Sequence, residues 1–487
     1  MTREIELKLE VDPDDLPLLL DDGLFANAES HSGHQSTVYY DTSDERLKKQ
    51  GYTLRVRSVG SRFVQTVKPI GDAVGLLSRE EIESDVPSME PDLRPLAEHP
   101  IHRLLKRGEH PALVPVMRSD VTRTTWEIDR HRRHIRVDLD HGTISAKERS
   151  REFAELELEL IEGSPASLVM AARRIADHVP VRLSVLTKAD RGYLLSSGAL
   201  GKVAKSGKVR VHTGMTVAEA FEVVVHNCLK HYRLNEPLVI RKCKAEALHQ
   251  CRVAMRRLRS AFTLFRPAVE DVEFQHLRHE LRWFTSQLGD ARNLDVYLQR
   301  ELPEAERAEL IADRERAYDA VADVMNAARF RRLLIDIAGW TALGAWRGGK
   351  VARRSIGTFA NARLDKLWHS IANAGHNIVQ MDETTRHGLR IEVKKLRYGT
   401  EFFQGLYPHA QIAEKQFSAA MEELQEFLGN LNDLANARGM TGASTEDDWL
   451  IGSYEERAYL KSAEESFRAL KRVGPFWRTP GKAGTAA

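Results

Sequence analysis

The sequence has little cysteine, almost no net charge and no long apolar run. Its three cysteines, Cys228, Cys243 and Cys251, show no CxxC spacing, which indicates reduced thiols rather than a disulfide framework. The 72 basic and 70 acidic residues leave a net charge of +2, so any anion site must come from local clustering. No stretch approaches the roughly 18 apolar residues of a membrane span. The opening MTREIELKLEV alternates charges where a secretory signal would be apolar. We therefore expect a cytoplasmic protein without a membrane partner.

What is present changes character along the chain. Short alternating runs such as TLRVR, HIRVDLD and FAELELEL dominate before Ser196, with helical patterns over 166–178 and 187–195. From Thr216 onward apolar residues recur at helical spacing instead. Because 487 residues exceed one usual core, we predict an α+β protein of two domains. The predicted boundaries are a β-rich domain over 1–198, a linker over 199–212, a helical domain over 213–475 and a flexible tail over 476–487.

The helical half contains an internal repeat. The run LHQCRVAMRRLRSAFTLF, starting at Leu248, reappears as HGLRIEVKKLRYGTEFF, starting at His387, and LGDARNLD is echoed by LGNLNDLA. On a helix, the basic members of each copy fall on one face and the apolar members on the other. The two basic faces consist of His249, Arg252, Arg256 and Arg259, and of His387, Arg390, Lys394 and Arg397.

Two explanations remain for these basic faces. Like charges four residues apart on a helix repel, so either acidic partners in the fold or a bound anion must compensate them. Arginine forks and lysine charges suit phosphate oxygens, and matched positions in both copies favour a linear polyanion. A metal site at the histidines is disfavoured because no carboxylate or second histidine follows at i+4. Specific nucleic acid binding is not expected, because exposed aromatics do not interleave with the basic residues.

The repeated HQxRVAMRRLRS and HGLRIEVKKLRY segments resemble the CHAD family of conserved-histidine α-helical domains. The resemblance spans residues 212–475. It implies an all-α helical bundle with an internal two-fold repeat, whose basic surface binds inorganic polyphosphate through the two faces named above. The second copy departs from the first in using lysine where the first has arginine.

The β-rich half carries charged residues on one side of its strands. In EIELKLEV, for example, Glu4, Glu6 and Lys8 alternate with apolar residues. Such a side is either a solvated outer face or the lining of a lumen. Clustered carboxylates repel unless a cation lies between them, and Mg²⁺ accepts carboxylates together with phosphate oxygens. A charged lumen would therefore suit a metal-bound phosphate.

Several motifs in order, ExExK, VYYDTSDERLKKQGYTLRVR, TVKP, LDHGTI, FAELELEL and TKADRGYLL, resemble the CYTH family of triphosphate tunnel metalloenzymes. The resemblance spans residues 1–198 and implies an eight-stranded antiparallel β tunnel, or barrel, that binds a triphosphate with Mg²⁺ or Mn²⁺. It implies that Glu4, Glu6 and Lys8 are catalytic. It implies metal binding by Glu4, Glu6, Asp140, Glu155, Glu157 and Glu159. It implies phosphate binding by Lys8, Arg55, Arg57, Lys68, Arg123 and Lys188. We assign structural roles to Arg79, Glu81 and Glu83.

The two resemblances together predict a divalent-metal-dependent triphosphatase. A polyphosphate-binding module beside the tunnel favours inorganic tripolyphosphate as the substrate, with phosphate and pyrophosphate as products. Two alternatives stay open: a non-catalytic scaffold that binds polyphosphate, and a tunnel enzyme that acts on thiamine triphosphate or ATP.

Overall fold

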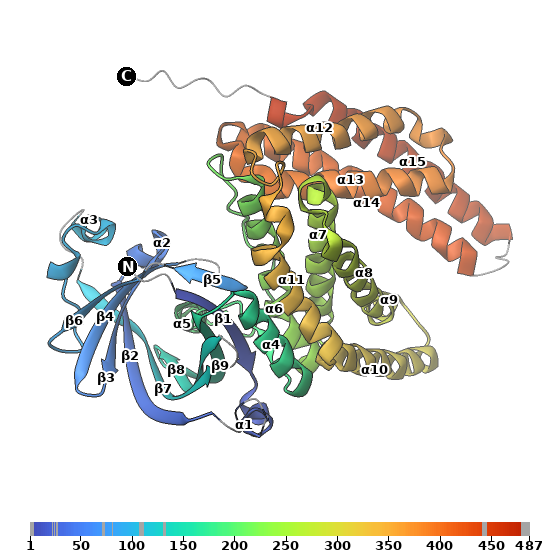
Figure 1. The fold of residues 1–487 in the computed structure, drawn as a ribbon. Helices are drawn as coiled ribbons and strands as arrows, with labels where there is room; N and C mark the ends of the chain where they lie inside the picture. Colours follow the sequence, from blue (N-terminus) through green and yellow to red (C-terminus); the bar gives the residue numbers. More distant parts are fainter. Residues whose placement is uncertain are drawn as a thin grey trace, which may run out of the picture. The chain divides into compact units, whose positions relative to one another are not determined.

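The computed structural model describes residues 4–21, 23, 25, 28–70, 74–79, 81–106, 112–129, 133–440 and 446–478 (Figure 1). The chain divides into two compact units. The first comprises Met1–Gly207, Val225–Arg256 and Val272–Gly344, and the second comprises Lys208–Val224, Arg257–Asp271 and Ala345–Ala487.

The N-terminal part forms an antiparallel sheet, as the alternating runs predict. The sheet has 10 strands in the order β10-β1-β9-β8-β7-β2-β3-β4-β6, with β5 paired to β1. Its strands are β1 (Glu4–Val11), β2 (Ser30–Thr42), β3 (Tyr52–Val59), β4 (Arg62–Pro69), β5 (Leu76–Arg79), β6 (Ile82–Val86), β7 (Leu113–Asp129), β8 (His134–Ala146), β9 (Arg149–Glu162) and β10 (Arg182–Leu183).

The expectation of a closed eight-stranded barrel is wrong. Where one long strand would close a barrel, the chain forms two short strands, β5 and β6, of 4 and 5 residues. β5 pairs with β1 and β6 pairs with β4. Among the described residues the two edges of the sheet are therefore connected through the chain between β5 and β6, and no continuous ladder joins them.

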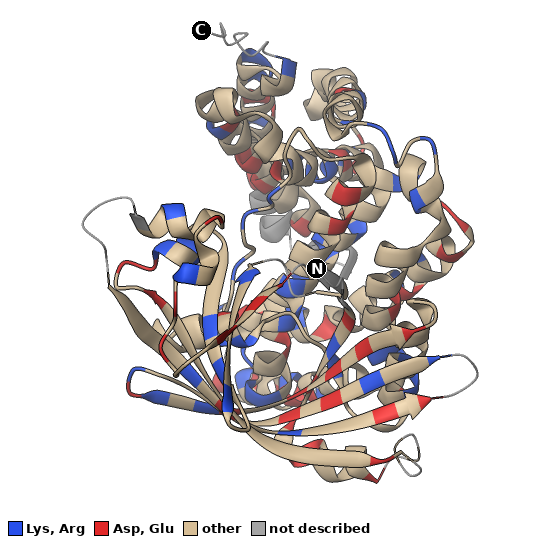
Figure 2. Cartoon of the chain, turned by 60° about the vertical axis from the view of Figure 1, so that its left-hand side comes forward, with Lys and Arg blue, Asp and Glu red and all other residues tan. Residues whose placement is uncertain are grey.

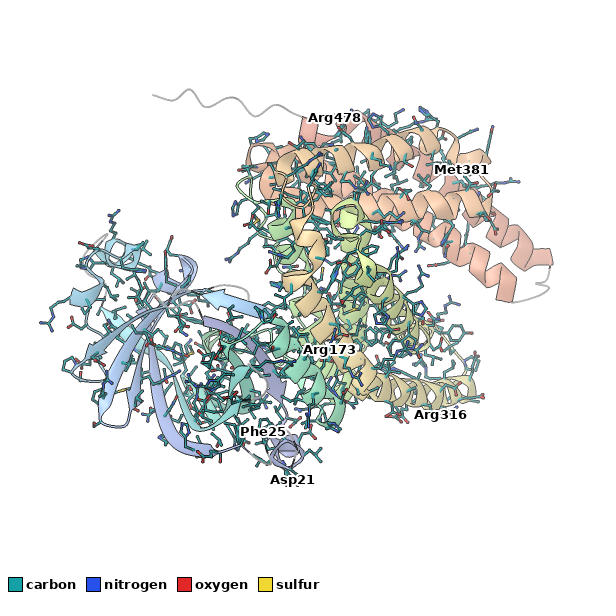
Figure 3. All side chains as sticks on the ribbon, viewed as in Figure 1. Asp21, Phe25, Arg173, Arg316, Met381 and Arg478 are labelled. Carbon is teal, nitrogen blue, oxygen red and sulfur yellow. The ribbon has the colours of Figure 1, made fainter. Side chains whose placement is uncertain are left out.

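Alternation along the strands separates an apolar side from a charged side. Leu7 and Leu9 of β1 are fully buried, and their side of the sheet packs against the helices α4 (Ala166–His178) and α11 (Ala328–Leu343) in one core. A second core covers β3 and β4 with α2 (Arg46–Lys49) and α3 (Pro100–Lys106). Phe25 packs on Trp126 at the first core, with ring centroids 4.6 Å apart; Phe25 is labelled in Figure 3. Figure 2 shows acidic and basic residues spread along the strands.

The remaining helices of the β-rich part are α1 (Leu16–Leu20) and α5 (Lys188–Ser196). The predicted helix over 166–178 is confirmed as α4, and the pattern over 187–195 is confirmed as α5 within one residue at each end. A capping box fixes the start of α5: the Thr187 hydroxyl accepts from the Asp190 amide, and the Asp190 carboxylate accepts from the Thr187 amide. Lys188 is thus the first residue of a well-defined helix.

The second half is helical, as predicted. Its long helices are α6 (Val217–Lys242), α7 (Ala245–Val269), α8 (Val272–Gln287), α9 (Gly289–Tyr297), α10 (Glu304–Asn326), α11, α12 (Ile356–Ala374), α13 (Glu383–Phe403), α14 (Gln411–Met440) and α15 (Glu446–Val473). Among the helices that the structure describes, none has the length and apolar character that a membrane crossing requires.

The two copies of the repeat differ in one respect. The first LG motif lies at a break, because Leu288 separates α8 from α9, whereas the second lies inside the continuous helix α14. The local packing is nevertheless alike. A side chain added at Gly289 would lie 3.9 Å from Arg252, and one added at Gly429 would lie 3.7 Å from Arg390. Equivalent arginines therefore approach equivalent glycines in the two copies.

The expected linker, residues 199–212, forms no helix or strand. It is nevertheless held by α6, because the Asn235 amide pairs with both the N–H and the C=O of Ala204. At the other end of the second unit, Phe476 and Trp477 are buried and both pack on Phe417. Packing thus extends into the expected tail, whose residues after 478 lie outside the described structure.

Candidate active site

The acidic part of the site lies on the charged side of three neighbouring strands. Lys8 on β1 is opposite Glu157 on β9, which in turn is opposite Asp138 on β8. The Lys8 ammonium lies 2.6 Å from Glu157 and 3.2 Å from Glu6. Although burial opposes the charge on Lys8, these two carboxylates raise its pKa.

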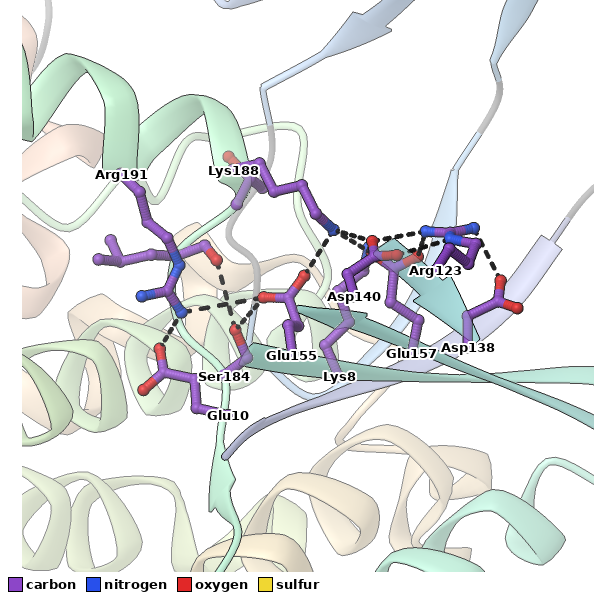
Figure 4. Close-up of polar contacts among 12 residues, drawn as sticks. Lys8, Glu10, Arg123, Asp138, Asp140, Glu155, Glu157, Ser184, Lys188 and Arg191 are labelled. Atoms are coloured by element: carbon purple, nitrogen blue, oxygen red, sulfur yellow. Dashed lines mark hydrogen bonds and ion pairs between the residues drawn. The ribbon is translucent and has the colours of Figure 1, made fainter. Parts of the chain in front are cut away.

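Two further cations bind Glu157 and the carboxylates beside it (Figure 4). Arg123 on β7 donates two hydrogen bonds of 2.7 Å to Asp140, one of 2.7 Å to Asp138 and one of 2.8 Å to Glu157. Lys188 at the start of α5 is 2.8 Å from Asp140, 3.1 Å from Glu155 and 2.9 Å from Glu157. Together with Lys8 and its two carboxylates, they form one network of three cations and five carboxylates: Glu6, Asp138, Asp140, Glu155 and Glu157.

The network favours the ionised forms of Asp140 and Glu157. Burial alone would raise the pKa of Asp140, but Lys188 and Arg123 lower it to about 2. For Glu157, burial is likewise outweighed by Lys188, Lys8 and Arg123, and its pKa is well below the ordinary value. The charged forms are therefore the resting forms at neutral pH.

The basic part of the site lies on β3 and β4. No carboxylate of the described residues lies within ion-pair distance of Arg55 or Arg57, and the buried Nε of Arg55 has no hydrogen-bond partner there. Arg57 donates to the Thr37 hydroxyl at 3.3 Å. Its pKa is lowered to about 10, first by the charge of Arg55 and then by burial. Two adjacent arginines with this little compensation favour an anion between them.

Lys68 on β4 differs from the two arginines in having an ion-pair partner and a strongly lowered pKa. Burial and the charges of Arg55 and Lys8 lower its pKa to about 7, although it forms an ion pair with Glu81. Glu81, to which we assign a structural role, therefore lies beside a predicted phosphate ligand. Glu83 accepts a hydrogen bond from Thr66 at 3.1 Å. The side chain of Arg79 lies outside the described residues.

The basic and acidic parts face each other. β4 and β1 are far apart in the order of the sheet, yet the charge of Lys8 lowers the pKa of Lys68. Across the same interior, Glu157 helps to raise the pKa of Arg55: burial lowers this pKa, but Tyr39, Glu81 and Glu157 together outweigh burial. Lys68 also forms an ion pair with Glu81, which follows the end of β5 by two residues, and β5 pairs with β1. The sheet therefore curls so that the charged sides of β1 and β4 face one interior.

The carboxylates nearest the start of β1 suit a divalent metal. Glu6 and Glu159 are directly opposite on β1 and β9, where like charges repel. Burial raises the pKa of Glu159, and the charges of Asp138 and Glu6 add to the shift, although Arg136, which lies 3.2 Å from Glu159, opposes it. Carboxylate oxygens are the donors that Mg²⁺ prefers. Within the described ranges no group of three such side chains could hold a metal ion by itself, so a metal here would need further oxygens. The side chain of Glu4 lies outside the described residues.

Three charged residues of this region are missing from the sequence-based set. Asp138 lies two residues before Asp140 in β8, so both side chains point to the same side of the strand. Glu10 continues the series of Glu6 and Lys8 along β1. Arg191 follows Lys188 by one turn of α5. Alternation alone could have identified the first two, whereas the third required knowledge of how α5 lies against the sheet.

The first basic face of the helical half forms a cation cluster. His249, Arg252 and Arg256 are partly buried on α7, and Arg292 of α9 joins them. Burial and the charges of Arg292, Arg256 and Arg252 lower the pKa of His249, despite Glu246. No described carboxylate lies within ion-pair distance of Arg252, Arg256 or Arg292. Arg252 instead donates to the Leu288 carbonyl at 2.5 Å, at the break between α8 and α9.

The second basic face adjoins a pocket. His387 lies 2.7 Å from the side-chain oxygen of Asn432, and both line a pocket of about 260 Å³ together with Arg386, Glu383, Thr384, Leu428 and Leu431. Arg397 donates to Gln425 at 2.9 Å. Arg259, Arg390 and Lys394 are partly buried on their helices. The structure therefore places both predicted faces at the protein surface or partly below it.

Comparison with known proteins agrees with this two-part organisation. A model of the CYTH domain matches residues 2–193, and a model of the CHAD domain matches residues 223–441. The fold thus combines a sheet with a charged interior and a helical region. The chain belongs to the proteins in which a CYTH domain is followed by a CHAD domain.

One relative of known activity is an inorganic triphosphatase from Haemophilus influenzae. It is 33% identical over 206 residues, which are 40% of this chain and 56% of the relative. The chain therefore spans little more than half the length of that protein.

Solved structures with partial similarity include both kinds of domain. The CHAD domain from Ricinus communis is 26% identical, with a TM-score of 0.47, and covers 55% of this chain and 97% of its own. HpAC1 from Hippeastrum, described as a putative adenylyl cyclase with a dominant triphosphatase activity, is 19% identical, with a TM-score of 0.29, and covers 40% of this chain and 97% of its own.

Proposed function

We propose that the sheet domain hydrolyses inorganic tripolyphosphate with the help of a divalent metal. The observation that carries the proposal is that Arg55 and Arg57, without ion-pair partners among the described side chains, face a buried acidic network containing Glu157 and Asp140. Cations without ion-pair partners fit phosphate oxygens, and nearby carboxylates fit a metal. The Haemophilus influenzae relative acts on inorganic triphosphate by name, which supports this substrate class.

The charge of each side chain determines whether we assign it to phosphate or to metal. Arg55, Arg57, Lys68 and Lys8 would neutralise phosphate oxygens, and Arg123 and Lys188 would hold the acids in place or bind phosphate themselves. Glu4, Glu6 and Glu159 would hold Mg²⁺ or Mn²⁺, together with oxygens of the substrate. The metal supplies Lewis-acid stabilisation of the phosphoryl charge when it is bound. Positioning and charge neutralisation provide most of the catalysis in phosphoryl transfer. All six metal ligands stay predictions. For Asp140, Glu155 and Glu157 the metal would have to replace cations that already bind their oxygens.

We also propose that the helical domain binds inorganic polyphosphate. The supporting observation is the cluster of His249, Arg252, Arg256 and Arg292, in which like charges lower the pKa of His249 and Arg252 beyond the effect of burial. Bound polyphosphate would remove that repulsion. With the domain boundaries proposed from the sequence, 1–198 and 213–475, the residues that would bind triphosphate fall in the first domain and those that would bind polyphosphate in the second.

A panel of substrates tests the proposal. Purified full-length protein is incubated with tripolyphosphate, long-chain polyphosphate, ATP or thiamine triphosphate, each with and without Mg²⁺ or Mn²⁺. We expect metal-dependent phosphate release to be fastest from tripolyphosphate. Tight binding of tripolyphosphate without release would instead identify a scaffold, and faster turnover of ATP or thiamine triphosphate would identify an organic substrate.

A further inference from the structure

Glu10 is the last charged residue on the charged side of β1, and arginines from two different helices bind it. Its opposite residue on β9 is Glu155, so two carboxylates would repel without cations nearby. Arg191 of α5 forms an ion pair with Glu10 and lies 3.8 Å from Glu155. Arg233 of α6 binds the other oxygen of Glu10 at 2.6 Å. Against burial, Arg191 and Arg233 lower the pKa of Glu10, which keeps this carboxylate charged.

Arg233 uses each nitrogen of its guanidinium group. The residue is only 3% exposed. Its Nε donates to the Leu183 carbonyl of β10 at 2.9 Å, and its other nitrogens form ion pairs with Glu10 and Glu236. Glu236 also accepts from Arg182 at 2.8 Å. A planar group held on all sides fixes distances and angles, and its removal leaves the partly buried Glu10 and the buried Glu236 with one cation fewer.

Arg191 transmits this constraint to the predicted phosphate site. Lys188 and Arg191 lie one turn apart on α5, so their side chains share a face of the helix. Arg191 anchors that face to Glu10, while Lys188 reaches Asp140, Glu155 and Glu157. The position of α5 along β1 therefore sets where the Lys188 ammonium lies.

We propose that Arg233 is a positioning residue of the active site. By holding Glu10, it keeps Arg191 anchored, and α5 then presents Lys188 to the triphosphate. α6 lies largely within the region matched by the CHAD model, so the helical domain contributes a structural part of the tunnel site in addition to any polyphosphate binding. The kinetic consequence rests on the proposed triphosphatase function, whereas the anchoring of α5 does not.

The test uses the full-length protein and two readouts. Hydrogen exchange reports on the amides of α5, and steady-state hydrolysis of tripolyphosphate with Mg²⁺ gives kcat and KM. Arg233→Met removes the charge, and Arg233→Lys keeps a charge without the fork. The matched control is Arg173→Met: Arg173 of α4, labelled in Figure 3, lies 2.5 Å from Asp336 of α11, in an ion pair that includes neither Glu10 nor α5.

We expect Arg233→Met to speed exchange in α5 about tenfold, because a locally anchored helix opens more often once its anchor is lost. We expect it to lower kcat/KM by about tenfold through misplacement of Lys188, with partial recovery in Arg233→Lys and wild-type values in Arg173→Met. If Arg233→Met does not fold, the same comparison is made with Arg233→Lys.

Unchanged exchange in α5, or an equal change in Arg173→Met, would overturn the inference. If the wild-type protein releases no phosphate but the Arg233 variants still loosen α5, the triphosphatase proposal fails while the anchoring role stands. If α5 loosens and kcat/KM stays at the wild-type value, the positioning role is wrong.

Discussion

Lys8 and Glu157 lie directly opposite each other on β1 and β9, and their charged atoms are 2.6 Å apart. Without bound substrate or metal, Lys8, a predicted phosphate ligand, thus pairs with Glu157, a predicted metal ligand. Binding of a metal and a triphosphate would exchange these partners, the metal taking carboxylate oxygens and the phosphate taking the ammonium. The exchange keeps the buried charge balanced, which an uncompensated buried ion would not.

Replacement of Lys8 tests this exchange. Lys8→Met removes a charged hydrogen-bond donor from the phosphate and leaves Glu157 with one cation fewer. We expect kcat/KM for tripolyphosphate to fall about 100-fold, within the range found for single groups that stabilise phosphoryl or oxyanion charge. Lys49→Met, at an exposed lysine of α2, is the control and should leave kcat/KM unchanged. Equal kcat/KM in Lys8→Met and the wild type would exclude Lys8 from the site.

The lowered pKa of Lys68 predicts a pH dependence. With a pKa near 7 in the free protein, Lys68 is charged below pH 7 and loses its charge as the pH rises. The free enzyme should therefore bind phosphate less well at higher pH, and kcat/KM should fall about tenfold between pH 6 and pH 9. In Lys68→Arg the charge persists over this range, so that decrease should disappear. The same decrease in both proteins would assign it to another group or to the substrate.

Divalent metal should stabilise the protein without any substrate. Glu6 and Glu159 face each other with like charges, and a cation between them relieves the repulsion. We expect Mg²⁺ or Mn²⁺ to raise the melting temperature by a few degrees, about what 1 kcal/mol produces in a domain of this size. Glu159→Gln should lose most of that increase, and chelation should reverse it in the wild type. The same melting temperature with and without Mg²⁺ or Mn²⁺ would argue against this site.

The cation cluster on α7 should govern polyphosphate affinity. Arg252 lies in the cluster, whereas Arg266 of the same helix is exposed and paired with Glu270 at 2.8 Å. Arg252→Gln should weaken binding of long-chain polyphosphate by about tenfold, the value of one charged hydrogen bond. It should also flatten the salt dependence of the affinity, since fewer counterions are released. Arg266→Gln should match the wild type in both. Equal losses in the two variants would indicate only a general charge effect.

Much of the fold could be predicted because alternation and helical spacing are local properties. EIELKLEV matches β1 residue for residue, and α4 has its predicted bounds. The closure of the sheet could not be read in this way. It depends on whether residues between β4 and β7 form one long strand or two short ones, and that choice is made by pairing with β1 and β4, which are distant in the sequence.

In the candidate site, too, some residues could be predicted from local sequence and others could not. Glu6, Lys8 and Glu157 could be named from their strands, because one side of a strand shares one environment. Arg191 and Arg233 could not, since nothing local distinguishes them from other helical arginines. Their role becomes visible only in the folded protein, where Arg191 of α5 and Arg233 of α6 both form ion pairs with Glu10.

Phosphate release from tripolyphosphate by Glu157→Gln tests the central claim most directly. Glu157 forms ion pairs with Lys8, Lys188 and Arg123. Replacing its carboxylate by an amide would therefore disturb both the cations that bind phosphate and the metal site. Glu152→Gln, on the exposed end of the same strand, is the matched control. We predict metal-dependent release in the wild type and Glu152→Gln, and a loss of about 100-fold or more in a folded Glu157→Gln. Equal release by all three proteins, or none by the wild type with any divalent metal, would contradict the account.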